Sequence, residues 1–263
     1  MSLFSFSERS RFVKSPSARS ALCATLVLVA LPVLAQAAGA AQWEYSGERG
    51  PAHWGKMRPD YATCDLGRRQ SPVDIVAPQK QKLPEIQFQY RTAPLRIVND
   101  GRTARVRMAN GSRIVLGRDS YLLQQFHFHL PGGDKVQGQE YDMAAHFVHK
   151  SAGRLVVVVV LFRKGAENAA LAQLWSKIPG RAAGERLFPE VAVDATQLLP
   201  AARGYYAYEG SPTAPPCTEG VSWMVLKQPL ELSADQLARF SKIFPNNARP
   251  AQPLHGRIVK ESQ

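Results

Sequence analysis

The run Leu155–Phe162 constrains the fold more than any other segment, because all eight of its residues are apolar. Successive side chains of a strand point to opposite faces, so this segment is apolar on both faces. It is therefore predicted to form a central strand that is buried on both sides. The run is too short to cross a membrane as a helix.

Further segments with strand character surround this run, and Pro and Gly recur between them as turn residues, a habit of β-rich domains. We find no internal repeat, low-complexity stretch or interdomain linker. The other predicted strands are Leu95–Val98, Ala104–Met108, Arg113–Leu116, Tyr121–His129, Asp142–His149 and Val221–Lys227.

Two segments have the apolar spacing of amphipathic helices. In Ala169–Ile178 the apolar residues recur at helical intervals. In Ser233–Phe244, Ser233 and Gln236 form a capping box ahead of the apolar stripe, and Pro245 ends the helix. Since strands dominate and the helices are peripheral, the sequence predicts a mixed, β-dominated single domain.

Three histidines lie on two strands that a short Gly-rich connector at 131–134 separates. In Gln125–His129, His127 and His129 point to one face and the two phenylalanines point to the other. If the next strand pairs antiparallel, His146 can meet these imidazoles. Three neutral imidazoles with one open position are typical of a catalytic zinc site. Core or surface histidines that merely alternate are the alternative, but three of the six histidines on adjacent strands favour a metal.

The first residues are typical of an export signal. Basic residues precede an apolar run at 21–35, and Ala35-Gln36-Ala37 is a small-residue cleavage pattern. The alternative is a membrane anchor, but the run is too short to span a bilayer comfortably. We therefore expect a signal peptide at residues 1–37, a mature domain at 38–263, and a periplasmic or secreted protein without a stable membrane anchor after cleavage.

Removal of the leader leaves two cysteines, Cys64 and Cys217. In an oxidising compartment two cysteines suggest one disulfide. Two unpaired thiols are the alternative.

The formal net charge of +12 would suit an anionic partner. However, the basic residues are scattered, with no long run and no interleaved aromatic residues. A solvated basic surface is therefore the preferred interpretation. Nucleic acid is in any case a poor partner for an exported protein.

From Trp43 to about Val259 the chain resembles the α-class carbonic anhydrases, specifically their exported bacterial branch. Many motifs occur in order and at family spacing, which is far more specific than any one of them. They are Trp43-x-Tyr45, Gly50-Pro51-x-His53-Trp54, Gln70–Ile75, Gln125–His129, His146–His149, Pro215–Trp223 and Arg249–Leu254. The resemblance implies a large, twisted, mainly antiparallel central sheet with small surface helices, and a conical cleft with zinc at its floor.

Carried over residue by residue, the resemblance implies roles around that cleft. The residues that match the zinc ligands are His127, His129 and His146. Gln125 and the backbone of Asn247 match the groups that hold two of the imidazoles, and Thr213 matches the threonine that hydrogen-bonds the attacking hydroxide. The apolar wall where carbon dioxide rests is matched by Val148, Val157, Val221 and Trp223. Cys64 and Cys217 match the disulfide of the bacterial members.

The chain departs from the family pattern at three functional positions. The glutamate behind the catalytic threonine falls on Gly133, and the glutamate that accepts a hydrogen bond from the third ligand falls on Ala144. The histidine that exports protons falls on Arg102, and Arg105 occupies another position on the polar wall. Arginine stays protonated and cannot relay protons as imidazole does.

Two functions fit these matches and departures. The first is a slow zinc enzyme that interconverts carbon dioxide and bicarbonate. The second is a zinc-binding relative with little hydration activity, which binds an anion or a protein partner through Arg102 and Arg105. In either case we expect a monomer or a weak dimer.

Overall fold

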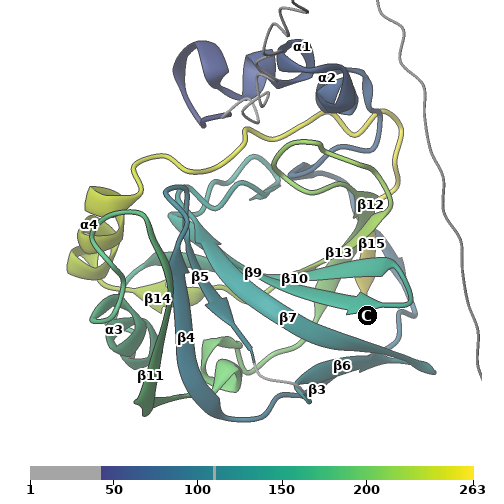
Figure 1. Cartoon of the computed structure of the whole chain (residues 1–263). Helices are drawn as coiled ribbons and strands as arrows, with labels where there is room; N and C mark the ends of the chain where they lie inside the picture. Colours follow the sequence, from purple (N-terminus) through teal and green to yellow (C-terminus); the bar gives the residue numbers. More distant parts are fainter. Residues whose placement is uncertain (1–42, 109–110) are drawn as a thin grey trace, which may run out of the picture. The chain divides into compact units, whose positions relative to one another are not determined.

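The computed structural model describes residues 43–108 and 111–263, so the predicted signal peptide lies outside the described residues. A large, mixed, 13-stranded sheet runs through this part of the chain (Figure 1). The strands of this sheet are β2 (Gln79–Gln81), β3 (Ile86–Gln89), β4 (Ala93–Asn99), β5 (Ala104–Arg107), β6 (Arg113–Leu116), β7 (Asp119–His129), β9 (Met143–Ser151), β10 (Arg154–Lys164), β11 (Ala183–Val193), β12 (Tyr205–Gly210), β13 (Val221–Leu226), β14 (Leu230–Leu232) and β15 (Lys260–Ser262).

The main path through the sheet is β11-β4-β5-β7-β9-β10-β13-β12-β15-β2. Most neighbours are antiparallel, whereas β10 pairs parallel with β13 and with β14, and β15 pairs parallel with β2. A separate pair of short strands, β1 (Asp74–Ile75) and β8 (Lys135–Val136), is also parallel. The β-dominated fold expected from the sequence is thus confirmed.

The central strand β10 is buried as its apolar run requires. All residues from Val156 to Phe162 are at most 6% exposed. Alternate side chains enter two separate clusters on the two faces of the sheet, Val156, Val158 and Val160 in one and Val157, Val159 and Leu161 in the other. A strand that is covered on both faces can have no polar alternation, which is why its sequence is apolar throughout.

The helices are small and lie at the margins of the sheet (Figure 1). They are α1 (Trp54–Met57), α2 (Thr63–Leu66), α3 (Ala169–Trp175) and α4 (Ala234–Ile243), with 3-10 turns at η1 (Gly47–Arg49), η2 (Pro51–His53), η3 (Pro59–Tyr61) and η4 (Ala195–Leu198). The predicted capping box of α4 is present, since Ser233 and Gln236 cap each other's backbone. Trp175 of α3 stacks on Phe240 of α4 with ring centroids 5.2 Å apart. Among the described helices, none combines the length and apolarity needed to cross a bilayer.

His149 belongs to the core and not to the cluster of the other strand histidines. It lies three residues after His146 on β9, hence on the opposite face, and is fully buried. Its Nε2 lies 2.8 Å from the hydroxyl of Tyr90. Burial lowers the pKa of His149 to about 3, so the imidazole is neutral in the folded protein.

This burial predicts a specific pH dependence of stability. The unfolded histidine titrates near pH 6.5 and the folded one near 3, so protonation favours the unfolded chain. The contribution of His149 is therefore complete above about pH 6.5 and is lost as the pH falls toward 3, with a slope approaching about 1.4 kcal/mol per pH unit. We would measure the free energy of unfolding of His149→Gln by urea titration between pH 6 and 4. Its slope against pH should be smaller than that of the wild type by up to about 1.4 kcal/mol per pH unit, which corresponds to one proton. The exposed His255 provides the control variant, His255→Gln, whose slope should equal that of the wild type. Equal slopes for wild type and His149→Gln would contradict the assignment.

Candidate metal centre

The antiparallel pairing of β7 with β9 brings three imidazoles together. His127 lies directly opposite His146 in the register, and His129 lies opposite Ala144. The ring centroids of His129 and His146 are 4.4 Å apart, and those of His127 are 4.9 Å from His129 and 5.4 Å from His146. One nitrogen of each ring lies within 4.8 Å of the others, so the three could hold one metal ion.

Two further groups set which nitrogen of each β7 histidine carries the proton. His127 Nδ1 lies 2.9 Å from Gln125 Oε1, and His129 Nδ1 lies 2.7 Å from the backbone oxygen of Asn247. Because both partners are acceptors, both Nδ1 atoms must be donors, and each Nε2 keeps a lone pair. The two Nε2 atoms nevertheless face each other at 3.1 Å. Two ligands of one tetrahedral zinc ion would lie about 3.3 Å apart, so a cation fits between these lone pairs.

Burial keeps the imidazoles neutral, as metal binding requires. It lowers the pKa of His129 to about 4, although the Asn247 carbonyl opposes this shift. It also lowers the pKa values of His127 and His146 well below the usual range, and the neighbouring imidazoles add to the effect. The donor set, three neutral nitrogens, is one that zinc accepts.

The three histidines line a cleft of about 310 Å³. One side of the cleft is apolar and carries Val148, Leu155, Val157, Val221 and Trp223, while a polar side carries Asp100, Arg102, Thr103 and Arg105. All the pocket residues expected from the sequence thus border one cavity. An apolar wall beside a site for a cation suits a small uncharged molecule next to a charged reagent.

Both arginines of the polar side are engaged within the protein. The guanidinium of Arg102 donates to the backbone oxygen of Trp43 through Nε at 3.2 Å and Nη2 at 3.1 Å, and lies 4.1 Å from the Trp43 ring. Arg105 forms a 2.6 Å ion pair with Asp100. The other oxygen of Asp100 accepts hydrogen bonds from the backbone N–H groups of Arg102 and Thr103. Arg105 is thus paired with a carboxylate, whereas Arg102 is held by a neutral carbonyl and an aromatic ring.

Thr213 lies on the loop between β12 and β13, which polar contacts hold in place. Ser211 and Ser71 exchange hydrogen bonds, each backbone N–H donating to the other's hydroxyl at 3.2 Å. The indole of Trp223 donates to the Ser211 carbonyl at 3.1 Å. Thr213, only 8% exposed, is thereby fixed at the wall of the cleft.

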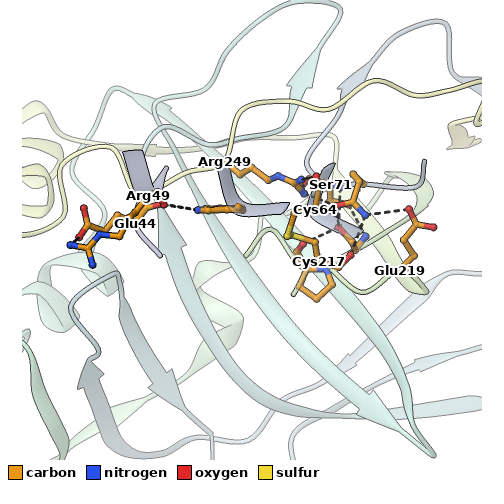
Figure 2. The surroundings of a disulfide bond; sticks show 11 residues. Glu44, Arg49, Cys64, Ser71, Cys217, Glu219 and Arg249 are labelled. Carbon is orange, nitrogen blue, oxygen red and sulfur yellow. Dashed lines mark hydrogen bonds and ion pairs between the residues drawn. A yellow bond between two sulfur atoms is a disulfide. The ribbon is translucent and has the colours of Figure 1, made fainter. Parts of the chain in front are cut away.

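A disulfide between Cys64 and Cys217 ties the far end of this loop to α2 (Figure 2). Cys217 has a left-handed backbone, with φ of 56°, and donates its N–H to the carbonyl of Ala214 at 3.0 Å. The buried guanidinium of Arg249 donates to the carbonyl of Cys64 at 2.7 Å and to Gln70 Oε1 at 2.8 Å. The covalent bond and these hydrogen bonds together fix the loop at both ends.

Comparison with known proteins agrees with this geometry. Residues 49–263 match the family model of eukaryotic-type carbonic anhydrases. The chain belongs to the α-carbonic anhydrase family. A carbonic anhydrase of Klebsiella pneumoniae is 41% identical over 239 residues, which cover 89% of this chain and 96% of that protein. One from Pectobacterium carotovorum is 39% identical over 228 residues, covering 86% and 93%.

Solved structures of α-carbonic anhydrases have the same fold. The α-carbonic anhydrase of Thermovibrio ammonificans, in complex with the inhibitor sulfanilamide, matches with a TM-score of 0.81 at 40% identity, covering 86% of this chain and all of that one. Dioscorin complexed with ascorbate matches with a TM-score of 0.78 at 31% identity, covering 84% of this chain and 97% of that one.

The two positions where this carbonic anhydrase lacks a family carboxylate differ in their surroundings. Gly133 has a φ of 82°, a left-handed conformation that favours glycine, and a Cβ atom there would lie 3.2 Å from the ring of Pro72. A glutamate at 133 would therefore be strained. Ala144, in contrast, lies in regular strand and is fully buried beneath His146. The backbone conformation at position 144 therefore does not oppose a glutamate, whereas that at 133 does.

Sequence reasoning missed three polar residues of this region. Tyr45 lines the cleft with its ring 6.3 Å from that of His129, and burial raises the pKa of its hydroxyl. Asp100 holds Arg105 and the backbone of Arg102 on the polar side of the cleft. Its Asp-Gly pair is a recognisable turn signal that could have pointed to this position. Asp134 turns inward because its segment is a bend rather than a strand, and burial raises its pKa to about 6. No local pattern identifies the buried position of Asp134.

Removal of the disulfide should destabilise this carbonic anhydrase. The bond closes a loop of 153 residues, and its loss frees the unfolded chain from that constraint. For the double variant Cys64→Ser/Cys217→Ser we expect the free energy of unfolding to fall by about 2–4 kcal/mol, measured by urea titration at pH 7. Wild-type protein unfolded in excess reductant is the control and should show a similar loss. An unchanged unfolding midpoint in the double variant would contradict the prediction.

Proposed function

We propose that His127, His129 and His146 hold one zinc ion and that the chain catalyses the reversible hydration of carbon dioxide to bicarbonate and a proton, at a slow rate. The observation that carries this proposal is the pair of Nε2 lone pairs 3.1 Å apart at the floor of a cleft with an apolar wall. Membership of the α-carbonic anhydrase family supports it.

Zinc in such a site supplies one chemical property, the lowering of the pKa of water to about 7. The chain's own residues supply the rest. Gln125 and Asn247 fix the two imidazole orientations, and burial keeps all three ligands deprotonated. Val148, Val157, Val221 and Trp223 provide a surface on which an uncharged gas can rest, and the Thr213 hydroxyl orients the attacking oxygen.

We attribute the slow rate to proton export and to the lack of a direct carboxylate partner for the third ligand. The polar side of the cleft carries two arginines, and an arginine side chain cannot relay a proton. His146 has no carboxylate on its own strand to accept its second ring proton, because position 144 is alanine. Partners of this kind typically contribute about 10–100-fold in metal affinity or activity.

The second candidate, a zinc-binding relative that binds an anion or a protein partner, is less well supported. It depends on Arg102 and Arg105, and both donate to acceptors within the protein. Dioscorin, a relative solved with ascorbate, illustrates how a ligand can be held on this fold.

The compartment in which the protein works is also a proposal. The Cys64–Cys217 disulfide suits an oxidising compartment, which supports a periplasmic or secreted protein. We propose carbon dioxide and bicarbonate as its small-molecule substrates and a monomer or weak dimer as its oligomeric state.

Metal analysis tests the zinc site. Purified wild type should contain about one zinc ion per chain, because three neutral nitrogens and one open position suit this ion. His129→Ala should lose it, since only two nitrogens remain. His255→Ala, at an exposed position, is the control and should retain the metal. Stoichiometric zinc in His129→Ala would refute the ligand set.

Stopped-flow hydration on the same metal-quantified samples then separates the two candidate functions. Zinc without any hydration rate above that of the buffer would favour the binding protein.

Substitution of Arg102 by histidine tests the proton path. Arg102→His should raise the hydration rate severalfold in dilute buffer, because imidazole can relay a proton at neutral pH. The gain should shrink in concentrated imidazole buffer, which carries the proton itself. Arg102→Gln removes the same guanidinium without adding a titratable group and should give no gain. A wild-type rate that is already fast in dilute buffer would contradict the slow-enzyme proposal.

A further inference from the structure

Besides Arg105 Nε, His149 Nδ1 and Arg249 Nε, two buried side-chain atoms in the described part of the chain have no hydrogen-bond partner. They are Oδ2 of Asp134 and Nε2 of His146. Asp134 is 1% exposed and His146 is 3% exposed. A buried polar group that makes no hydrogen bond destabilises the folded state, so both atoms require a partner.

The two atoms are chemically complementary. Of the two His146 ring nitrogens, Nε2 is the enclosed one, which leaves Nδ1 as the nitrogen directed to the cleft. If Nδ1 holds the metal, it is deprotonated and Nε2 must carry the ring proton. Nε2 is then a buried donor. Oδ2 of Asp134 is a buried acceptor.

Asp134 is held on the side of the sheet where His146 lies. Its Oδ1 accepts hydrogen bonds from the Tyr208 hydroxyl at 2.8 Å and from the backbone N–H of Val73 at 3.0 Å. The ring of Tyr208 stacks on Trp223 with centroids 5.9 Å apart, and Trp223 in turn meets the His146 ring edge-on at 5.1 Å. Asp134 thus contacts one ring of this aromatic pair and His146 contacts the other.

A small side chain lies in the same buried cluster. Ala144 precedes His146 by two residues and shares its strand face. It packs with Val73, Tyr208 and Trp223 in one apolar cluster. Its methyl group provides no acceptor for His146. The donor and the acceptor are not in direct contact, and a bridging water is the usual solution for two such groups.

We propose that Asp134 accepts the hydrogen bond of the His146 Nε2–H through one buried water, and so positions His146 for zinc in place of a carboxylate at 144. This inference rests on the proposed zinc site. Asp134 is then a positioning residue, which acts on the metal only through the His146 ring.

The main test is the zinc affinity of a variant that keeps the shape of Asp134. Asp134→Asn retains an oxygen for Tyr208 and Val73 but replaces the second acceptor by an amide donor. We expect its zinc dissociation constant, measured by chelator competition, to rise about 10–100-fold. Tyr208→Phe is the matched control, because it removes the hydrogen bond to Oδ1 of Asp134 within the same buried cluster and leaves Oδ2 unchanged. Its dissociation constant should stay within about threefold of wild type.

A double-mutant cycle separates this hydrogen bond from a general effect of charge or folding. Ala144→Glu supplies a direct acceptor, so Asp134→Asn should cost less than about threefold in that background. An equal cost in both backgrounds, or no cost in the single variant, would overturn the inference while leaving the zinc site intact. A wild type that binds no zinc would instead overturn the proposed function and this inference with it.

Nitrogen-15 NMR of the zinc-loaded wild type gives a readout that needs no variant. The His146 ring should show metal coordination at Nδ1 and a protected, slowly exchanging proton at Nε2. Coordination through Nε2, or a rapidly exchanging Nε2 proton, would refute the proposal even if Asp134→Asn failed to fold.

Discussion

The register between β7 and β9 is the constraint on which the rest of the site depends. It places His127 opposite His146 and, on the other face, Phe126 opposite Phe147. These two fully buried rings stack with centroids 5.2 Å apart. A slip of one residue would turn the histidines into the core and the phenylalanines into the cleft. Apolar packing on one face therefore enforces the polar geometry on the other.

The central strands could be predicted from the sequence because burial imposes a regular pattern on them. Strand β10 is apolar throughout, and β7 alternates strictly where it carries the histidines. No such pattern predicts β11, which lies at the end of the strand order, is largely exposed and contains Pro189. At an edge, one row of backbone groups is free and side chains meet solvent, so neither alternation nor the absence of proline is required.

The candidate site was predictable to the extent that its parts lie on those strands. The pairing of His127 with His129 follows from strand periodicity, and His146 joins them on the further expectation that the next strand pairs antiparallel. The proposed roles of Gln125, Asn247 and Thr213 required a resemblance to a family. Asn247 and Thr213 come from separate segments, and strand periodicity does not show that Gln125 on β7 contacts an imidazole. The position of Asp134 depends on a left-handed glycine before it and on partners from two distant strands or loops. Similarly, only the structure places Trp43 against Arg102, where its carbonyl and its ring hold the guanidinium.

The imidazole cluster and the loop that carries Thr213 are formed by contacts that span very different lengths of chain. The imidazoles come from one pair of neighbouring strands, whereas the loop that carries Thr213 is secured by cysteines 153 residues apart. Chain entropy opposes the long closure more than the short one. The cluster of imidazoles can therefore assemble before the thiols meet. The imidazole cluster thus needs only the pairing of two strands, whereas the loop that carries Thr213 also needs redox conditions in which its disulfide forms.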